Sequence, residues 1–414
     1  MKHYIFCLAL AVIAAFVTKR TNAQDKSWII PAIESQTYTG APVANGCIGI
    51  MPWKELLEIK HVMLNSVFER NSPRGVSKAQ MGINPFILHL SINGHVMNKN
   101  SITDWKQSID MKHALHQTSF CVKNQAEISY SIAALGNLPY SGLIEIKIKA
   151  LKDISFNCKN EMEFPTEFVD RYIGHKSLND LEFHQQLIVA SAYTAYKSHQ
   201  IAASSAFIYS SKTLFLQCKD QSQVLSGTIK SGETIHFYVV GTICSSRDFS
   251  DPIGEVERQV AYISITGLEN ILQGHYDYWA NLWTSDIVIE GDLQAQRDVR
   301  FALFNLYGSI RKDSRLSSSP MGLSSQAYNG HVFWDSELWM YPPLLYMHPE
   351  IAKSMIDYRF DRLKGAIQKA RSRGLDGALF PWESDDSGEE STPTWCLTGV
   401  LELHISADIA IATF

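Results

Sequence analysis

The sequence lacks several signatures that would identify common classes of protein. It has no GxSxG elbow, no P-loop and no GxGxxG, so serine hydrolase, nucleotide-binding and dinucleotide-binding functions lose support. The net charge of −5, without a Lys/Arg cluster, argues against a nucleic-acid partner. The cysteines outside the N-terminal run show no CxxC pair and no zinc spacing, which favours free, mostly buried thiols. They are Cys47, Cys121, Cys158, Cys218, Cys244 and Cys396.

Long apolar runs are also scarce, and the clearest one lies at the N-terminus. The run Tyr4–Val17 follows Lys2 and is too short for a comfortable membrane span. The small residues Thr21-Asn22-Ala23 then offer a cleavage site. Residues 1–23 are therefore predicted to be a signal peptide, which implies a secreted or periplasmic protein, no membrane partner and an environment that permits disulfides. Lys19 and Arg20 are atypical and leave an uncleaved anchor open.

The chain is long enough for several domains and is rich in tryptophan. Its 414 residues suggest two or three domains with an ample core. Hydrophobic and charged contents of 45% and 19% are ordinary for a globular protein. An aromatic content of 11%, with nine tryptophans, suits a protein that binds carbohydrate.

The first half of the mature chain has the pattern of a β-protein. Ile144, Ile146 and Ile148 alternate with charged residues, as on a strand with one buried face. Asn93-Gly94 follows another alternating run and is a strong hairpin turn signal. Many such short strands predict an antiparallel β-sandwich over residues 24–255.

The second half has helical spacing. A helical linker is expected over residues 256–292, followed by a helix from Gln294 to Arg311. A further helix begins at Pro349 and ends before Gly374, which fits a C-terminal cap. The last run, Gly399–Phe414, ends without a cap, so the chain is expected to be truncated relative to a complete enzyme.

Two segments combine tryptophan with carboxylates: GHVFWDSELWM (330–340) and GALFPWESDDSGEESTP (377–393). Indole faces stack on the C–H face of a pyranose, and carboxylates accept hydrogen bonds from vicinal hydroxyls. Trp334 and Asp335 are therefore predicted to bind sugar, and Trp382 with Glu383 is a second candidate pair, although an acidic loop of this kind can also be a solvated turn. Two carboxyl groups in one cleft also support glycoside cleavage.

Structural interpretations compete with these roles. Asp335 precedes an apolar run and could be a helix N-cap, and Trp339 is expected in the core rather than as a sugar platform. The acidic loop after Glu383 resembles a calcium loop only faintly, and Glu389 and Glu390 could point into the cleft or into water. No metal and no cofactor are predicted.

Specific motifs resemble glycoside hydrolase family 65. GHVFWDSELWMYP at 330–342 resembles the family's GH-hydrophobe-FWD signature, and residues 348–384 resemble its adjoining YR-containing helix and WES motif. APVANGCIGI at Ala41–Ile50 resembles a motif near the start of the family's N-terminal domain. The resemblance is strongest over 330–384 and looser before it.

The resemblance implies a fold and a chemistry. The fold is an N-terminal β-sandwich, a helical linker and, over residues 293–414, the first part of an (α/α)6 barrel. The chemistry is inverting cleavage of α-glucosides, with Trp334 and Asp335 lining the glucose subsite and Trp382 and Glu383 at the same pocket. The family's general acid, together with the hydrolases' base or the phosphorylases' phosphate loop, is expected beyond Phe414, so the catalytic residues are not identified.

Three functions remain open at this point. A hydrolase is favoured because a phosphorylase outside the cytoplasm would release a sugar phosphate that the cell must recapture. A phosphorylase and a non-catalytic sugar-binding remnant are the alternatives. The expected partners are an α-glucoside or oligosaccharide and a second polypeptide that completes the barrel, which the incomplete set of helices suggests.

Overall fold

The structure, a computed structural model, describes residues 26–32, 40–70, 72, 75–179 and 183–414. The predicted signal peptide, residues 1–23, lies outside this range. The strands are β1 (Ile29–Ala32), β2 (Val43–Ala44), β3 (Ile48–Pro52), β4 (Ile59–Arg70), β5 (Ser77–Met81), β6 (Asn84–Ile92), β7 (His95–Val96), β8 (Thr103–Asp110), β9 (Leu115–Val122), β10 (Ala126–Ala134), β11 (Ser141–Ala150), β12 (Ile154–Glu163), β13 (Val169–Asn179), β14 (His184–Tyr193), β15 (Gln200–Tyr209), β16 (Leu214–Lys219), β17 (Ser222–Ile229) and β18 (Thr234–Ser245).

The helical elements follow the strands, apart from the short η1 (Lys99–Ser101). They are α2 (Pro252–Thr266), α3 (Leu268–Leu282), α4 (Leu293–Ser309), η2 (Ala327–Gly330), η3 (Ser336–Met340), α5 (Tyr341–Met347), α6 (Pro349–Asp361), α7 (Leu363–Ser372), η4 (Gly399–Leu401) and α8 (His404–Thr413).

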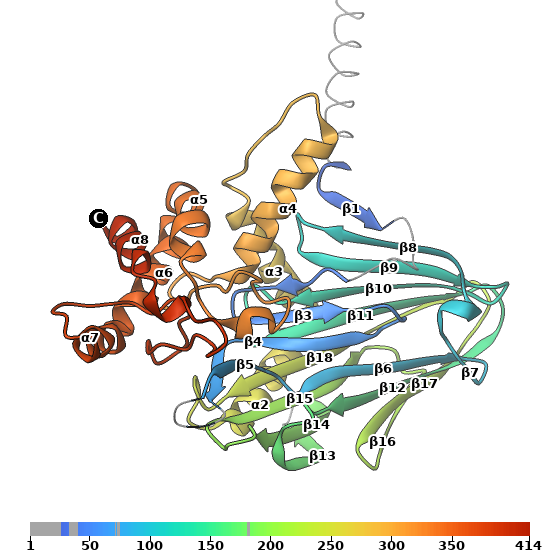
Figure 1. The fold of residues 1–414 in the computed structure, drawn as a ribbon. Coiled ribbons are helices and arrows are strands. Elements are labelled where there is room, and N and C mark those ends of the chain that lie inside the picture. Colours follow the sequence, from blue (N-terminus) through green and yellow to red (C-terminus); the bar gives the residue numbers. More distant parts are fainter. Residues whose placement is uncertain (1–25, 33–39, 71, 73–74, 180–182) are drawn as a thin grey trace, which may run out of the picture.

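Within the described residues the strands form three antiparallel sheets, which confirms the predicted antiparallel sandwich (Figure 1). The largest has the order β1-β8-β9-β10-β11-β18-β15-β14-β13, and β16-β17-β12-β6-β7 packs against it. The third sheet, β2-β3-β4-β5, lies on the side that faces the later helices (Figure 1). Its position matters because β4 and β5 reach the candidate site.

The local sequence signals explain the strands well. Ile144, Ile146 and Ile148 on β11 are fully buried, while the charged residues between them point outward. Asn93 and Gly94 both have positive φ angles, 49° and 79°, and Ile92 pairs with His95 across them. This is the primed hairpin turn that an Asn-Gly pair favours.

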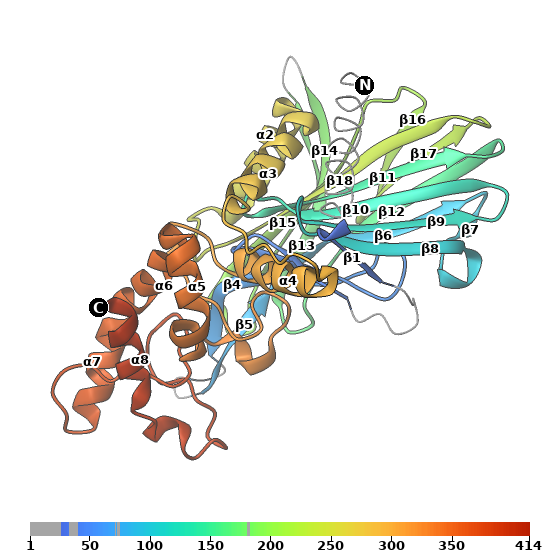
Figure 2. The ribbon, with the colours of Figure 1, turned by 90° about the horizontal axis from the view of Figure 1, so that it is seen from above.

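Helices α2 and α3 cover one face of the large sheet (Figure 2). Val260, Ile263 and Ile271 of these helices form one buried cluster with Leu187 and Val240 of the sheet. The last strand ends at Ser245, and α2 begins at Pro252, capped by Asp251, whose carboxylate accepts from the Gly254 N–H at 2.9 Å. The helical linker therefore forms an integral layer of the sandwich domain.

Helix α4 packs against β2 of the sandwich, whereas α5 to α8 project from one end of it, with the C-terminus far from the sheets (Figure 1). Asp292 caps α4 by accepting from the backbone N–H groups of Gln294 and Ala295. The prediction of a single helix from Pro349 to Gly374 is wrong. The helix is interrupted at Arg362, whose φ is −101° and ψ is 7°. Gly388 lies close to this break, because an added Cβ there would be 2.5 Å from the Arg362 Cβ.

The six cysteines of the described residues are free, and three are buried: Cys47, Cys158 and Cys244. Burial raises the pKa of the Cys47 thiol to about 11 and that of Cys158 to about 12. The predicted free state is thus confirmed, whereas the expectation of mostly buried thiols holds for half of them. In the part of the chain that is described, no helix is long and apolar enough to cross a bilayer.

Candidate functional site

The two tryptophan–carboxylate segments lie side by side. Val332 pairs with Ser384 in an antiparallel bridge, with N–H···O distances of 2.9 and 3.0 Å, and Ser384 also pairs with Glu390. This bridge joins segments that are some fifty residues apart in the sequence. It brings the backbone that carries Trp334 and Asp335 to the loop that carries Trp382 and Glu383.

Asp335 does not cap a helix, so the N-cap interpretation is wrong. Its backbone is already helical, with φ −52° and ψ −34°, and its side chain makes no capping hydrogen bond. Among the described residues its carboxylate has no hydrogen bond and no ion pair, although the residue is half-buried. A half-buried carboxylate without an internal partner is available to an external donor.

The turn after Asp335 is a π-turn, Ser336–Met340, and Trp339 lies within it. The Tyr341 N–H bonds to the Ser336 carbonyl, five residues back. Trp334 is half-buried, with its ring 5.3 Å from the His404 ring of α8 and 6.3 Å from Trp339. Trp339 is 66% exposed, so the expectation that it lies in the core is wrong. The wider π-turn displaces residues after Asp335 from α-helical register.

Trp382 and Glu383 are packed more tightly than Asp335. The Trp382 ring meets the edge of Phe333 at 5.6 Å, and Gly399 lies so close that an added Cβ would be 2.2 Å from the indole. Glu383 is only 5% exposed, and its Oε2 lies 2.7 Å from Nδ1 of His331. Its Oε1 has no hydrogen bond to a described residue.

The β-sandwich reaches this site through His331. Nε2 of the fully buried His331 lies 2.8 Å from the hydroxyl of Ser77, at the start of β5. Gly330, with φ +70°, permits the approach, because an added Cβ there would be 2.4 Å from the Ala79 Cβ. Sequence reasoning missed both His331 and Ser77; the GH at the start of the FWD segment was the available signal.

Arg70 makes a second contact from the sandwich. It stands opposite Ser77 across β4 and β5, and its Nη2 donates to Asp385 Oδ2 at 2.7 Å and to the hydroxyls of Ser387 and Ser391 at 3.0 Å. Burial alone would raise the pKa of Asp385. Hydrogen bonds from the serines and the charge of Arg70 outweigh that effect and hold the pKa below its usual range. The acidic loop is therefore anchored by a sandwich arginine.

A buried ion pair fixes the FWD segment from the other side. Arg359 of α6 forms a two-pronged pair with Glu337 at 2.8 Å for each bond, and it also donates to the Phe333 carbonyl. Both side chains are at most 2% exposed. The neighbouring Tyr358 donates its hydroxyl to the backbone of Asp385 at 2.7 Å. The YR pair of α6 thus holds both segments of the site.

Most carboxylates of the two segments are already engaged. Glu337 pairs with Arg359, Asp385 with Arg70, and Glu390 with Lys369 at 2.5 Å. Glu389 is exposed and 3.9 Å from Arg70. Of the carboxylates in these two segments, only those of Asp335 and Asp386 form no hydrogen bond or ion pair with another described side chain. Glu383 has one oxygen without a hydrogen bond to a described residue.

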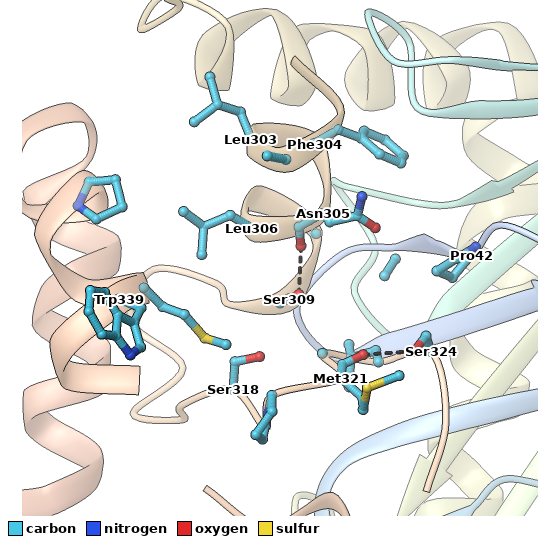
Figure 3. Close-up of a pocket in the computed structure, with 18 of the residues that line it drawn as sticks. Pro42, Leu303, Phe304, Asn305, Leu306, Ser309, Ser318, Met321, Ser324 and Trp339 are labelled. Carbon is cyan, nitrogen blue, oxygen red and sulfur yellow. Dashed lines mark hydrogen bonds between the residues drawn. The ribbon is translucent and has the colours of Figure 1, made fainter. Parts of the chain in front are cut away.

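A pocket lies elsewhere, between α4, the loop 317–325 and η3. It measures about 730 Å³ and is mostly apolar (Figure 3). None of the four predicted sugar-binding residues lines it, although the exposed Trp339 does. The polar side chains at its wall, such as Ser309 and Ser324, bond to nearby backbone carbonyls. Its lining suits apolar side chains better than a sugar.

No group of His, Cys, Asp and Glu within the described ranges has the arrangement of a metal site. Asp385, the residue at the centre of the faint calcium-loop pattern, is instead occupied by Arg70 and serine hydroxyls. The chemistry that the site offers is hydrogen bonding to hydroxyl groups beside indole surfaces.

A β-sandwich joined to helices that carry paired tryptophan and carboxylate segments is an arrangement suited to binding carbohydrate. Residues 43–282 match the glycosyl hydrolase family 65 N-terminal domain, and residues 300–414 match the central catalytic domain of that family. The chain belongs to glycosyl hydrolase family 65.

Named relatives of the chain fall into two reaction types. A kojibiose hydrolase of Flavobacterium johnsoniae is 37% identical over 100% of this chain, and one of Mucilaginibacter mallensis is 36% identical over 100%. A kojibiose phosphorylase of Thermoanaerobacter brockii is 40% identical over 38% of the chain. The chain spans 62% of the length of each kojibiose hydrolase and 22% of that phosphorylase.

The fold has a counterpart among solved structures. A protein described as "Putative kojibiose phosphorylase from human microbiome" superposes with a TM-score of 0.77 at 16% identity, covering 94% of this chain and 55% of that one. At this identity the match establishes the fold: a β-sandwich followed by the first helices of the catalytic domain.

Proposed function

We propose that the chain is the substrate-binding portion of an inverting α-glucosidase that acts on kojibiose or a related glucosyl conjugate. The observation that carries this proposal is the similarity to two kojibiose hydrolases over the full length of the chain. The phosphorylase match covers a minority of the chain. Phosphorolysis by the same fold remains the second candidate, and a non-catalytic sugar-binding protein the third.

The site geometry supports sugar binding at the two segments. Among the described residues the Asp335 carboxylate has no partner, and Glu383, next to Trp382 in the sequence, bonds through Oε2 alone. Charge-assisted hydrogen bonds from sugar hydroxyls to such oxygens are stronger than neutral ones. We infer that Trp334, Asp335, Trp382 and Glu383 line the glucose subsite.

The proposal places the general acid and base outside these 414 residues. An inverting glycosidase needs two carboxyl groups roughly 6.5–9.5 Å apart on opposite faces of the bond. Most acids of the two segments are engaged in ion pairs or hydrogen bonds within the fold, as described above. Asp335 cannot serve both faces alone.

We further propose that additional helices cover the exposed apolar face of the helical region, either on the same polypeptide or on a second one. Several large apolar side chains there are at least 60% exposed. They are Trp339, Tyr346, Phe360, Trp395, Leu397, Leu401, Leu403 and Ile411. Such a number of exposed large apolar side chains in one region is typical of a surface that another segment covers, and the hydrolase relatives have further length to supply the cover. Export from the cytoplasm is proposed from the signal-like pattern of residues 1–23.

The test is an assay of the purified chain against kojibiose, trehalose and maltose, with and without phosphate, together with equilibrium binding of kojibiose. Binding without turnover is the expected result. Phosphate-dependent turnover would establish the phosphorylase instead. Robust phosphate-independent turnover would show that the acid lies within the chain, with Glu383 and Glu389 as the first candidates. Absence of sugar binding would refute the proposed function.

A further inference from the structure

Helix α8 brings a histidine against the first tryptophan–carboxylate segment. The ring of His404, at the start of α8, lies 5.3 Å from the Trp334 indole, and the two ring planes are at 84°. Helix α8 also packs against the π-turn that follows Asp335. Neither tryptophan–carboxylate segment contains His404, so the structure adds a residue to the surroundings of Trp334 that the sequence motifs did not indicate.

Asp408 holds the His404 ring in one orientation. Nδ1 of the ring lies 2.8 Å from Oδ2 of Asp408, one turn further along the helix. Asp408 is only 8% exposed and shares the buried face of α8 with Ile405 and Ile409. A carboxylate among apolar side chains is costly to bury without a partner, so the bond to Nδ1 leaves the ring little freedom to turn.

The other ring nitrogen of His404, Nε2, is available to an external group. Oε2 of Glu402 is 3.6 Å from it, which is too long for a hydrogen bond, and no described residue makes one to it. The His404 side chain is 44% exposed. A hydroxyl group both donates and accepts, so a hydroxyl can bond to Nε2 in either protonation state of the imidazole.

Two hydrogen-bonding groups therefore accompany the Trp334 indole. They are the Asp335 carboxylate, which has no partner among the described residues, and Nε2 of His404. We propose that His404, oriented by Asp408, is a further sugar-binding residue, and that its Nε2 bonds to a hydroxyl of the glucosyl unit at Trp334. This inference rests on the proposed function, because it requires a sugar at Trp334.

Three substitutions separate the role of Nε2 from the role of the ring. His404→Asn keeps a nitrogen near the position of Nδ1 and removes Nε2, whereas His404→Gln carries its nitrogen near the position of Nε2. His404→Phe keeps only the aromatic contact with Trp334. In isothermal titration with kojibiose, His404→Asn and His404→Phe should bind about three- to tenfold more weakly, since one hydrogen bond is lost, and His404→Gln should lose less.

A merely structural histidine predicts the opposite order. If His404 served only to pair with Asp408 or to pack on Trp334, His404→Asn or His404→Phe would bind kojibiose best, and that order would overturn the proposal. His404→Asn can still pair with the buried Asp408, so the comparison with His404→Gln stands even if His404→Phe does not fold. Thermal unfolding checks that each variant is folded at the titration temperature.

Sugar analogues identify the bonded hydroxyl. Monodeoxy analogues of kojibiose, each lacking one hydroxyl of the glucosyl unit, are titrated against the unaltered chain and against His404→Asn. For one analogue the unaltered chain should lose about three- to tenfold in affinity, whereas His404→Asn should bind that analogue and kojibiose equally, because the bond is already absent. If every analogue loses the same factor with both proteins, no hydroxyl is coupled to Nε2 and the proposal is overturned.

His113 of the sandwich domain provides a matched control. Its Nδ1 also lies 2.8 Å from an aspartate oxygen, Oδ2 of Asp110, and its side chain is 42% exposed. Its ring stands 5.2 Å from that of Tyr276 on α3, at 73°. His113→Asn and His113→Gln should bind kojibiose as the unaltered chain does.

The outcomes separate this inference from the proposed function. If the unaltered chain binds kojibiose and the three His404 variants bind it equally well, the role of His404 is refuted while the proposed function stands. Equal weakening by His404→Asn and His404→Gln would also refute it, because Nε2 would then make no difference. If the unaltered chain binds no sugar, the proposed function fails, and the role of His404 fails with it.

Discussion

A substitution at Asp335 should weaken sugar binding without changing the stability of the fold. Its carboxylate has no partner among the described residues, so Asp335→Asn should change the free energy of unfolding by less than about 0.5 kcal/mol. The same substitution should cost at least about 2 kcal/mol in kojibiose binding, because a charge-assisted acceptor is lost. Urea unfolding and calorimetric titration measure the two quantities. Unchanged binding would remove Asp335 from the sugar site.

Glu337 is expected to behave in the opposite way. Glu337→Gln leaves the buried Arg359 guanidinium without its counter-charge, which should cost about 3–5 kcal/mol of unfolding free energy. The exposed i,i+4 pair of Lys353 and Asp357 provides the control, since Lys353→Ala should cost no more than about 0.5 kcal/mol. Similar losses for the two variants, measured by urea unfolding, would contradict the buried-pair assignment.

Sequence patterns predicted the candidate sugar-binding residues but not the buried residues that contact them. Tryptophan beside carboxylate is a local pattern, and it indicated Trp334, Asp335, Trp382 and Glu383. His331 and Ser77 are 254 positions apart, so no local pattern could pair them. Trp339 was misplaced because its exposure depends on a π-turn, for which the sequence has no reliable signal.

At the scale of elements, local patterns predicted strands and helix starts. Alternation on β11 and the Asn-Gly turn were sufficient because neighbouring residues determine them. The break between α6 and α7 was missed because it depends on Gly388, which approaches Arg362 from the acidic loop. A tertiary contact of this kind overrides a helical stripe that continues through the break.

Substitutions at Gly388 and Gly374 test whether Gly388 fixes the break between α6 and α7. Both have positive φ, 74° and 71°, but only Gly388 has close neighbours, since nothing lies within 4 Å of an added Cβ at Gly374. Gly374→Ala should cost about 1–2 kcal/mol from the left-handed backbone alone. Gly388→Ala should exceed it by about 1–3 kcal/mol, because it also overpacks the junction. Equal losses in thermal unfolding would mean that the loop does not fix the break.

At the scale of the whole molecule, α2 and α3 belong to the sandwich. A fragment of residues 26–290 should therefore melt cooperatively with a β-type circular dichroism spectrum. A fragment of residues 26–250 exposes Leu187, Val240 and the rest of the apolar cluster beneath the helices, so it should aggregate. Cooperative, soluble behaviour of the shorter fragment would show that the helices are dispensable.

The contact between α3 and the sandwich should make the protein sensitive to acid. Buried His275 accepts the Gly136 N–H at Nδ1 and donates from Nε2 to the His113 carbonyl, and burial lowers its pKa to about 4. The unfolded chain binds this proton near pH 6.5 and the folded chain resists it, so stability falls as pH drops from about 6.5 to about 4.

His275→Gln measures that contribution. The variant should be less stable at pH 7, because the bonds of the ring are altered, but its melting temperature should fall less between pH 7 and pH 5 than that of the unaltered chain. The buried His116, with a pKa lowered to about 3, acts in the same direction and remains in both proteins. An equal fall in both would assign the acid sensitivity to other groups.

The hydrogen bonds between β4–β5 and the acidic loop, residues 377–393, also bear on the order in which parts of the protein fold during synthesis. Arg70 and Ser77 emerge from the ribosome long before residues 377–393, and domains generally fold as units, the N-terminal one first. The acidic loop has little regular structure of its own in the described chain. We therefore expect this loop to take its shape by packing against β4 and β5 after those strands have folded, so that the candidate site forms only once the sandwich is in place.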